Sequence, residues 1–302
     1  MFYKFLDPKN DFCFKKIFGS EKNKDILIHF LNDMLVFKEN LPIKNVTFLK
    51  TIQEPEIAVQ KTSIVDVLCK DERGNQYIVE IQVAKEKGFE KRAQYYAAKA
   101  YCSQAHAGGS YADLKEIIFL AIADFVIFPN KAAYKSDHIV LDKETCENDL
   151  KDFSFTFLEL PKFNRNINNL ETIIEKWAYF FKHAETTSEH DVQKIIEGDD
   201  IMERVYEELN RFSWNEEELL TYDQSEKYYN SYLATIEYGI EKGREEGREE
   251  GKKEGREEGI EIGFEKSKLA IAQNMLKAGI DEKTISLVTG LSLEQIKAFF
   301  KI

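Results

Sequence analysis

Two acidic side chains and one amide interrupt two short apolar segments of this 302-residue chain, on either side of a tight turn. Asp66 lies in the first segment, and Glu80 and Gln82 lie in the second. A carboxylate buried among apolar side chains is costly unless a metal ion, hydrogen bonds or a polar cleft accommodate its charge. Carboxylate oxygens suit a hard divalent ion such as Mg²⁺ or Mn²⁺. These residues therefore predict a metal-dependent site.

The two segments alternate as paired β-strands do. One side of the period-two pattern is wholly apolar and must face a core; it comprises Val65, Val67, Cys69, Tyr77, Val79, Ile81 and Val83. The other side carries the three polar residues among apolar ones; it comprises Ile64, Asp66, Leu68, Ile78, Glu80 and Gln82. The pattern predicts a hairpin with a polar interruption on one of two buried faces.

The turn sets how the two strands pair. If residues 72–74 form a three-residue loop with Gly74 in the left-handed conformation, Asp71 flanks Asn75. Asp66 then lies directly opposite Glu80, with Cβ atoms about 4.5–5.5 Å apart. Two carboxylates at that spacing repel each other unless a cation lies between them. The alternative is an exposed edge hairpin whose acids simply face water.

At these residues the chain resembles the PD-(D/E)xK phosphodiesterase superfamily and, within it, the Rpn family of recombination-promoting nucleases, which are also described as transposases. The signature is an Asp on one strand and Glu-x-Lys on the next, and Rpn members carry Glu-x-Gln, as in Glu80-Ile81-Gln82. Three further segments fit the family in the right order; they are Asp11 to Gly19, Lys91 to Tyr96, and Gly108 to Leu114. The resemblance covers roughly residues 7–165.

The resemblance implies a fold and a set of metal ligands. The fold class is α/β, with a restriction-endonuclease-like core in which helices flank a mixed sheet, followed by an all-helical C-terminal region. Asp66, Glu80 and the backbone carbonyl of Ile81 would bind Mg²⁺ or Mn²⁺. Gln82 replaces the lysine of the superfamily, so it can bind water but brings no positive charge. The charge of the transition state must then be met by a second metal or by a lysine from elsewhere.

Other site residues follow from the same resemblance. Asp11 would add an acidic group near the metal, or would serve only as a helix N-cap or first-turn acid. Arg92, Tyr96 and Lys99 share one helix face and would contact DNA phosphate, or would form an ordinary surface face with partly buried stems. Lys15 is a weaker DNA-binding candidate.

Composition bounds the class of protein. Hydrophobic residues make up 43% of the chain and aromatic residues 13%, which excludes disorder of the whole. No apolar run is long enough to cross a bilayer, and we expect no signal peptide. The four cysteines are scattered without Cys-x-x-Cys spacing, which favours a reducing cytoplasm. The net charge of −12 is concentrated after residue 184, so it does not decide whether the first half binds DNA.

Four regions are expected. Residues 1–168 would be the nuclease-like domain, and residues 169–236 an acidic helical region. Residues 237–266 would be a helix with glycine at every fourth position, and residues 267–302 a small module resembling a helix-turn-helix. The glycine helix should be marginal alone, because each glycine costs about 1 kcal/mol relative to alanine. It is either a solvated spacer or a surface for self-association, and the last module is either a DNA reader or a packing unit.

Two functions remain open from the residues. One is a metal-dependent DNA endonuclease linked to recombination or mobile elements. The other is a catalytically silent nuclease fold whose helical tail binds partners or forms homo-oligomers. The retained set of Asp66, Glu80 and Gln82 favours the enzyme.

Overall fold

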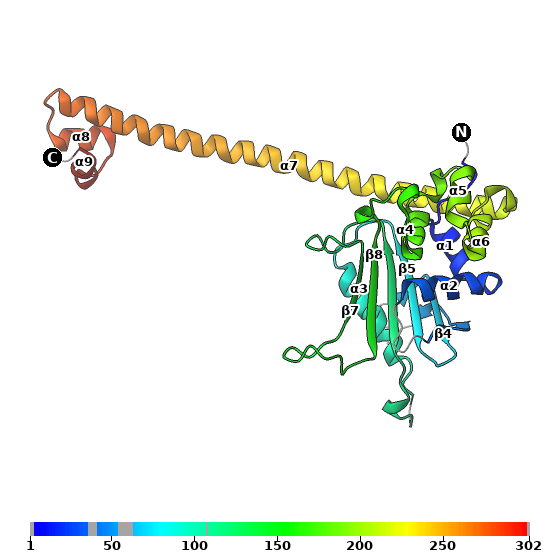
Figure 1. Ribbon diagram of the computed structural model, residues 1–302. Coiled ribbons are helices and arrows are strands. Elements are labelled where there is room, and N and C mark those ends of the chain that lie inside the picture. The colour runs from blue at the N-terminus through cyan, green and yellow to red at the C-terminus, as the bar shows by residue number, and fades with distance from the viewer. Residues whose placement is uncertain (1–2, 36–40, 54–62, 107, 301–302) are drawn as a thin grey trace. The chain divides into compact units, whose positions relative to one another are not determined.

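A mixed six-stranded sheet organises the first part of the chain. The computed structural model describes residues 3–35, 41–53, 63–106 and 108–300. The strand order is β1-β4-β5-β6-β8-β7, in which β5, β6 and β8 are parallel and the other pairings are antiparallel (Figure 1). The strands are β1 (Val46–Phe48), β4 (Val67–Asp71), β5 (Gln76–Gln82), β6 (Ile117–Ala123), β7 (Lys135–Ile139) and β8 (Phe153–Glu159). A separate pair consists of β2 (Ile52–Gln53) and β3 (Ser63–Ile64).

Helices precede, interrupt and follow the sheet. They are α1 (Asp11–Phe18), α2 (Lys24–Met34), α3 (Phe89–Cys102), α4 (Ile173–His183), α5 (Glu189–Ile196), α6 (Asp200–Glu208), α7 (Glu216–Lys277), α8 (Glu282–Thr289) and α9 (Leu293–Phe300). Gly19 ends α1 and separates it from α2. Helix α3 ends at Cys102.

The hairpin of β4 and β5 has the expected register. Val67 pairs with Val79, so one step further out Asp66 lies across from Glu80. Gly74 has φ of +92°, and the Asp71 N–H donates to the Asn75 carbonyl at 2.9 Å. The buried Asp71 carboxylate accepts hydrogen bonds from the backbone N–H groups of Arg73 and Asn75 and from the Tyr77 hydroxyl. These bonds fix the turn, and the turn fixes the register.

The alternation stops at Asp66 instead of continuing toward the N-terminus. Val67, Cys69, Tyr77, Val79 and Ile81 lie in one core cluster as expected. Val65, which was expected on the same side, packs instead in the cluster on the opposite face. Ile64 is 57% exposed and does not belong to a buried face. The reason is that the chain leaves the β4 ladder at Asp66, since the Val65 N–H bonds to Thr51 instead of β5.

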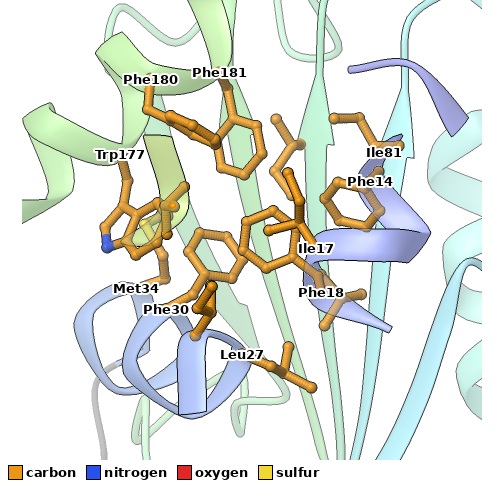
Figure 2. Close-up of a cluster of buried hydrophobic side chains, with 14 of the residues drawn as sticks. Phe14, Ile17, Phe18, Leu27, Phe30, Met34, Ile81, Trp177, Phe180 and Phe181 are labelled. Atoms are coloured by element: carbon orange, nitrogen blue, oxygen red, sulfur yellow. The ribbon is translucent and has the colours of Figure 1, made fainter. Parts of the chain in front are cut away.

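The two faces of the sheet are covered by different helices. One face packs against α3, whose apolar contacts are Phe89, Ala93, Ala97 and Ala100. The other face packs against α1, α2, α4, α5, α6 and the start of α7. Rings from α1, α2 and α4 meet there, as Figure 2 shows for Phe14, Phe18, Phe30, Trp177 and Phe181. Strand β6, covered on both faces, is buried at every residue.

The core cluster on the α1 side of the sheet includes residues from well beyond residue 168. Trp177, Tyr206 and Tyr222 all belong to the cluster that covers the sheet, and Tyr222 is only 3% exposed. The Tyr222 hydroxyl also accepts the Asp7 N–H at 3.1 Å. The first compact unit accordingly runs from Met1 to Asn230. The acidic helices of residues 173–208 are therefore a layer of this unit, because their apolar sides complete its core.

The second unit, Ser231–Ile302, contains the rest of α7 with α8 and α9. Helix α7 is continuous through all seven glycines from Gly239 to Gly263. A Cβ added at any of them would meet no described atom within 4 Å apart from the adjoining backbone of the helix itself. Two short helices follow it. Asp281 caps α8, and Gly290 ends it with φ of +71°. The backbone N–H of Ser292 donates to the Gln295 side chain, and the backbone N–H of Gln295 donates to the Ser292 hydroxyl. Ala272, Ile285, Leu291 and Ile296 form a small core.

We predict that Phe181→Ala lowers the free energy of unfolding by about 3–5 kcal/mol, because it leaves a cavity among fully buried rings. Phe212→Ala is the matched control, since that ring is 78% exposed and its loss should cost no more than about 0.5 kcal/mol. Urea denaturation followed by circular dichroism measures both. Equal losses in the two variants would contradict a shared core between α4 and the sheet.

Candidate active site

The candidate site lies where β4 begins and β5 ends, with a helix on each side. Asp66 accepts the backbone N–H of Ile81 through Oδ2 at 2.9 Å. Its side chain is 14% exposed, whereas Glu80 as a residue is 4% exposed. The Asp66 backbone in turn favours the charged form of the Glu80 carboxyl. Asp66 is thus tied to the strand of Glu80 across the hairpin, as the register requires.

Both acids are destabilised as anions. Burial raises the pKa of the Asp66 carboxyl to about 6, while the Ile81 N–H and the Lys15 ammonium act in the opposite direction. Burial first, and then the negative charge of Asp66, raises the pKa of Glu80 well above its usual value, although Arg92 offsets part of the rise. Two carboxyls that face each other in a dry setting are poised to gain from a cation.

Helix α1 brings a lysine and a third acid to Asp66. The Lys15 ammonium lies 3.4 Å from Asp66 Oδ1 and 2.6 Å from Asp11 Oδ1. Asn10, not Asp11, caps the helix by accepting the N–H groups of Phe12 and Cys13. The N-cap half of the alternative for Asp11 is therefore wrong, whereas its place as an acid in the first turn of α1 is confirmed. Its side chain also interacts with Asp66. Lys15, expected as a weak DNA-binding candidate, lies among the acids of the site.

Helix α3 brings an arginine to the other side. Arg92 Nη2 donates to Gln82 Oε1 at 2.6 Å, and Gln82 Nε2 donates to the carbonyl of Ala84 at 3.1 Å. Arg92 Nη1 pairs with Glu86. The guanidinium also lies 4.9 Å from the centre of the Phe89 ring and 5.7 Å from that of Tyr96. The amide of Gln82 is therefore engaged with the helix.

The remaining candidates lie near or beyond this centre. Burial first, and then the negative charges of Glu80, Glu86 and Asp66, raise the pKa of the half-buried Tyr96 hydroxyl, while the Arg92 guanidinium acts in the opposite direction. Lys99 lies seven residues beyond Arg92 on α3, about 10 Å further along the helix axis. Glu86 was not anticipated from the sequence, because only the fold brings the β5–α3 connection against Arg92.

The donor set fits a divalent metal. Glu80 Oε1 is buried and has no hydrogen-bond partner in the part of the chain that the structure describes. Within the same residues, no three His, Cys, Asp or Glu side chains gather as a metal cluster. A bound ion would thus rest on two carboxylates plus main-chain and water oxygens. The carbonyl of Ile81 is suited to this, since it lies on the same strand edge as the N–H that reaches Asp66.

Comparison with known families agrees with the geometry. Residues 8–239 match the model of the PD-(D/E)XK nuclease family transposase, so the chain belongs to this class of nuclease-fold proteins. Residues 265–301 match the C-terminal helix-turn-helix domain of the Rpn/YhgA-like nuclease family. Together the two matches make the chain an Rpn-family transposase-related protein, as the sequence resemblance predicted. No curated protein and no solved structure matches the chain.

We predict that Asp66→Asn stabilises the metal-free protein at pH 8. A carboxyl whose pKa is raised on folding is stabilising in its protonated form, so stability falls as pH rises from about 4 through 6 and stays lower above that. The asparagine side chain keeps an acceptor for the Ile81 N–H without the charge, and the gain should be of the order of 2 kcal/mol.

The measurement is the melting temperature from pH 4 to pH 8 in EDTA, with exposed Asp149→Asn as control. Mn²⁺ should raise the melting temperature of the parent but not that of Asp66→Asn. A variant that melts below the parent at pH 8 would contradict the buried, repelling acid pair.

Proposed function

We propose that this protein is a divalent-metal-dependent DNA endonuclease that acts in recombination or in the movement of genetic elements. The observation that carries the proposal is the opposed pair of Asp66 and Glu80, with Glu80 Oε1 buried and unpartnered among the described residues. Membership of the PD-(D/E)XK nuclease family supports the reaction class. The helix-turn-helix match supports DNA as the partner.

The residues divide the work of phosphodiester hydrolysis. Asp66, Glu80 and the Ile81 carbonyl would hold Mg²⁺ or Mn²⁺. The ion would polarise the phosphoryl oxygen and lower the pKa of an attacking water. Asp11 would hold Lys15 in place, and Lys15, Arg92, Tyr96 and Lys99 would orient the DNA backbone. Phosphate contacts of this kind position the strand without reading its sequence.

The helices and the cysteines bear on where the protein acts in the cell. The described residues contain no helix that is long and apolar enough to span a membrane. All four cysteines are free, and Cys13 and Cys69 are buried. Free thiols support the cytoplasmic location that we propose for a nuclease that acts on DNA.

We predict that purified protein nicks or linearises plasmid DNA in Mg²⁺ or Mn²⁺ and not in EDTA. Asp66→Ala and Glu80→Ala should each lower the rate by at least about 100-fold, because each removes a ligand of the proposed ion. Asp149→Ala, which removes an exposed acid, should cleave at the parent's rate. Undiminished cleavage by the Asp66→Ala protein would reject the site. A parent that binds DNA and never cleaves would favour the silent binding module.

We also propose that two copies of the chain associate through the tail, because the exposed glycine row of α7 allows close backbone approach. A chain ended after Asn230 should keep its fold and its Mn²⁺ affinity, because it retains the whole first unit. It should lose self-association and part of its DNA affinity. Light scattering and a DNA titration measure both properties. A monomer in both forms, with equal DNA affinity, would reduce the glycine helix to a spacer.

A further inference from the structure

The site lacks a lysine at the position that the PD-(D/E)xK pattern reserves for a cation. That position is Gln82, two residues after Glu80 on the same face of β5. A neutral amide cannot offset negative charge that develops on a phosphate. Another group of the fold must therefore bring the missing charge to this place.

Both the oxygen and the nitrogen of the Gln82 amide form hydrogen bonds. Its oxygen accepts from Arg92 Nη2 at 2.6 Å, and its nitrogen donates to the Ala84 carbonyl at 3.1 Å. The Ala84 bond fixes which way the amide faces, so the oxygen points at the arginine. A side chain held in this way is suited to orienting a guanidinium, because a neutral acceptor anchors the cation without neutralising it.

Arg92 has the features of a fixed cation. Its side chain is 23% exposed, and its guanidinium lies against the Phe89 ring. Its Nε is buried and, among the described residues, has no hydrogen-bond partner. Within that part of the chain the site therefore holds two unpartnered buried atoms of opposite kind, the acceptor Glu80 Oε1 and the donor Arg92 Nε. A metal ion would satisfy the first, and a phosphate oxygen would satisfy the second.

We propose that Gln82 is a positioning residue that holds Arg92 beside the acid pair, and that Arg92 supplies the positive charge facing the scissile phosphate. The proposal rests on the nuclease function proposed above. Glu86, whose side chain is 48% exposed, pairs with Arg92 from the outside and is the anion that an incoming phosphate displaces.

Lys15 is the competing cation, and the contacts favour Arg92 over it. The Lys15 ammonium is shared between two carboxylates, Asp11 and Asp66, so its charge is already neutralised. A divalent ion on Asp66 would also repel it from that side. Arg92 instead donates a hydrogen bond to Gln82, the residue that replaces the lysine of the PD-(D/E)xK pattern.

The proposal is tested by moving the positive charge from Arg92 on α3 to residue 82 on β5. Arg92→Gln should lower kcat at saturating DNA by at least about 10-fold, in line with the loss of one fixed charge-stabilising group. Adding Gln82→Lys to Arg92→Gln should restore most of that loss, because a lysine at residue 82 would place its ammonium near the vacated Nη2. Gln82→Met keeps the length of the side chain but not the anchor, and should lower kcat less than Arg92→Gln does.

Lys143→Gln is the control for removal of one positive charge, since Lys143 is exposed in the β7–β8 connection. If Arg92→Gln does not fold, Arg92→Met retains the stem on Phe89 and takes its place. The proposal is overturned if Arg92→Gln keeps kcat within twofold of the parent while Lys15→Gln loses it. It is also overturned if the double variant is no more active than Arg92→Gln.

Calorimetric titration of Mn²⁺ without DNA gives a readout that does not depend on cleavage. Removing a positive charge beside Glu80 should tighten Mn²⁺ binding several-fold in Arg92→Gln, leave it unchanged in Lys143→Gln, and return it toward the parent in the double variant. Equal Mn²⁺ affinity in Arg92→Gln and the parent overturns the proposed position of the charge, even if the parent cleaves no DNA. If the affinities are equal and the parent nevertheless cleaves DNA, the proposed nuclease function stands and only the proposed role of Arg92 is rejected.

Discussion

The repulsion between Asp66 and Glu80 is the constraint on which the rest of the site depends. The hairpin register places them opposite each other, and the hydrogen bonds around Asp71 and Gly74 hold that register. A hairpin free to slip by one residue would turn every side chain to the other face. The hydrogen bonds of the turn thus maintain an arrangement that is unfavourable in the absence of a cation.

The two helices beside the hairpin each place a positive charge near the acid pair, from opposite faces of the sheet. Helix α1 packs on one core cluster and presents Lys15, whereas α3 packs on the other cluster and presents Arg92. Each helix is held by large apolar contacts, so the position of each cation is set by packing and not by the weak exposed ion pairs themselves. The cores on the two faces therefore serve the site as well as stability.

Features set by neighbouring residues could be predicted from the sequence. Contacts between segments far apart in the chain could not. Gly74 and the alternation of residues 67–82 predicted the register. The role of α4 in the core was missed, because an amphipathic helix does not reveal which surface it covers. The bond from Gln82 to Arg92 was missed as well, since it depends on how α3 packs, which no local pattern records.

The glycine row of α7 has a geometric consequence of its own. Four residues turn an α-helix by about 400°, so each glycine lies about 40° further round than the one before. From Gly239 to Gly263 the row therefore winds well over half a turn around the helix. A straight partner helix can meet it at a single crossing, and the crossings resemble one another because the charge pattern nearly repeats. If the partner helix slides by four residues along α7, it meets the next glycine in an equivalent crossing. The row therefore offers several nearly equivalent positions for a partner helix.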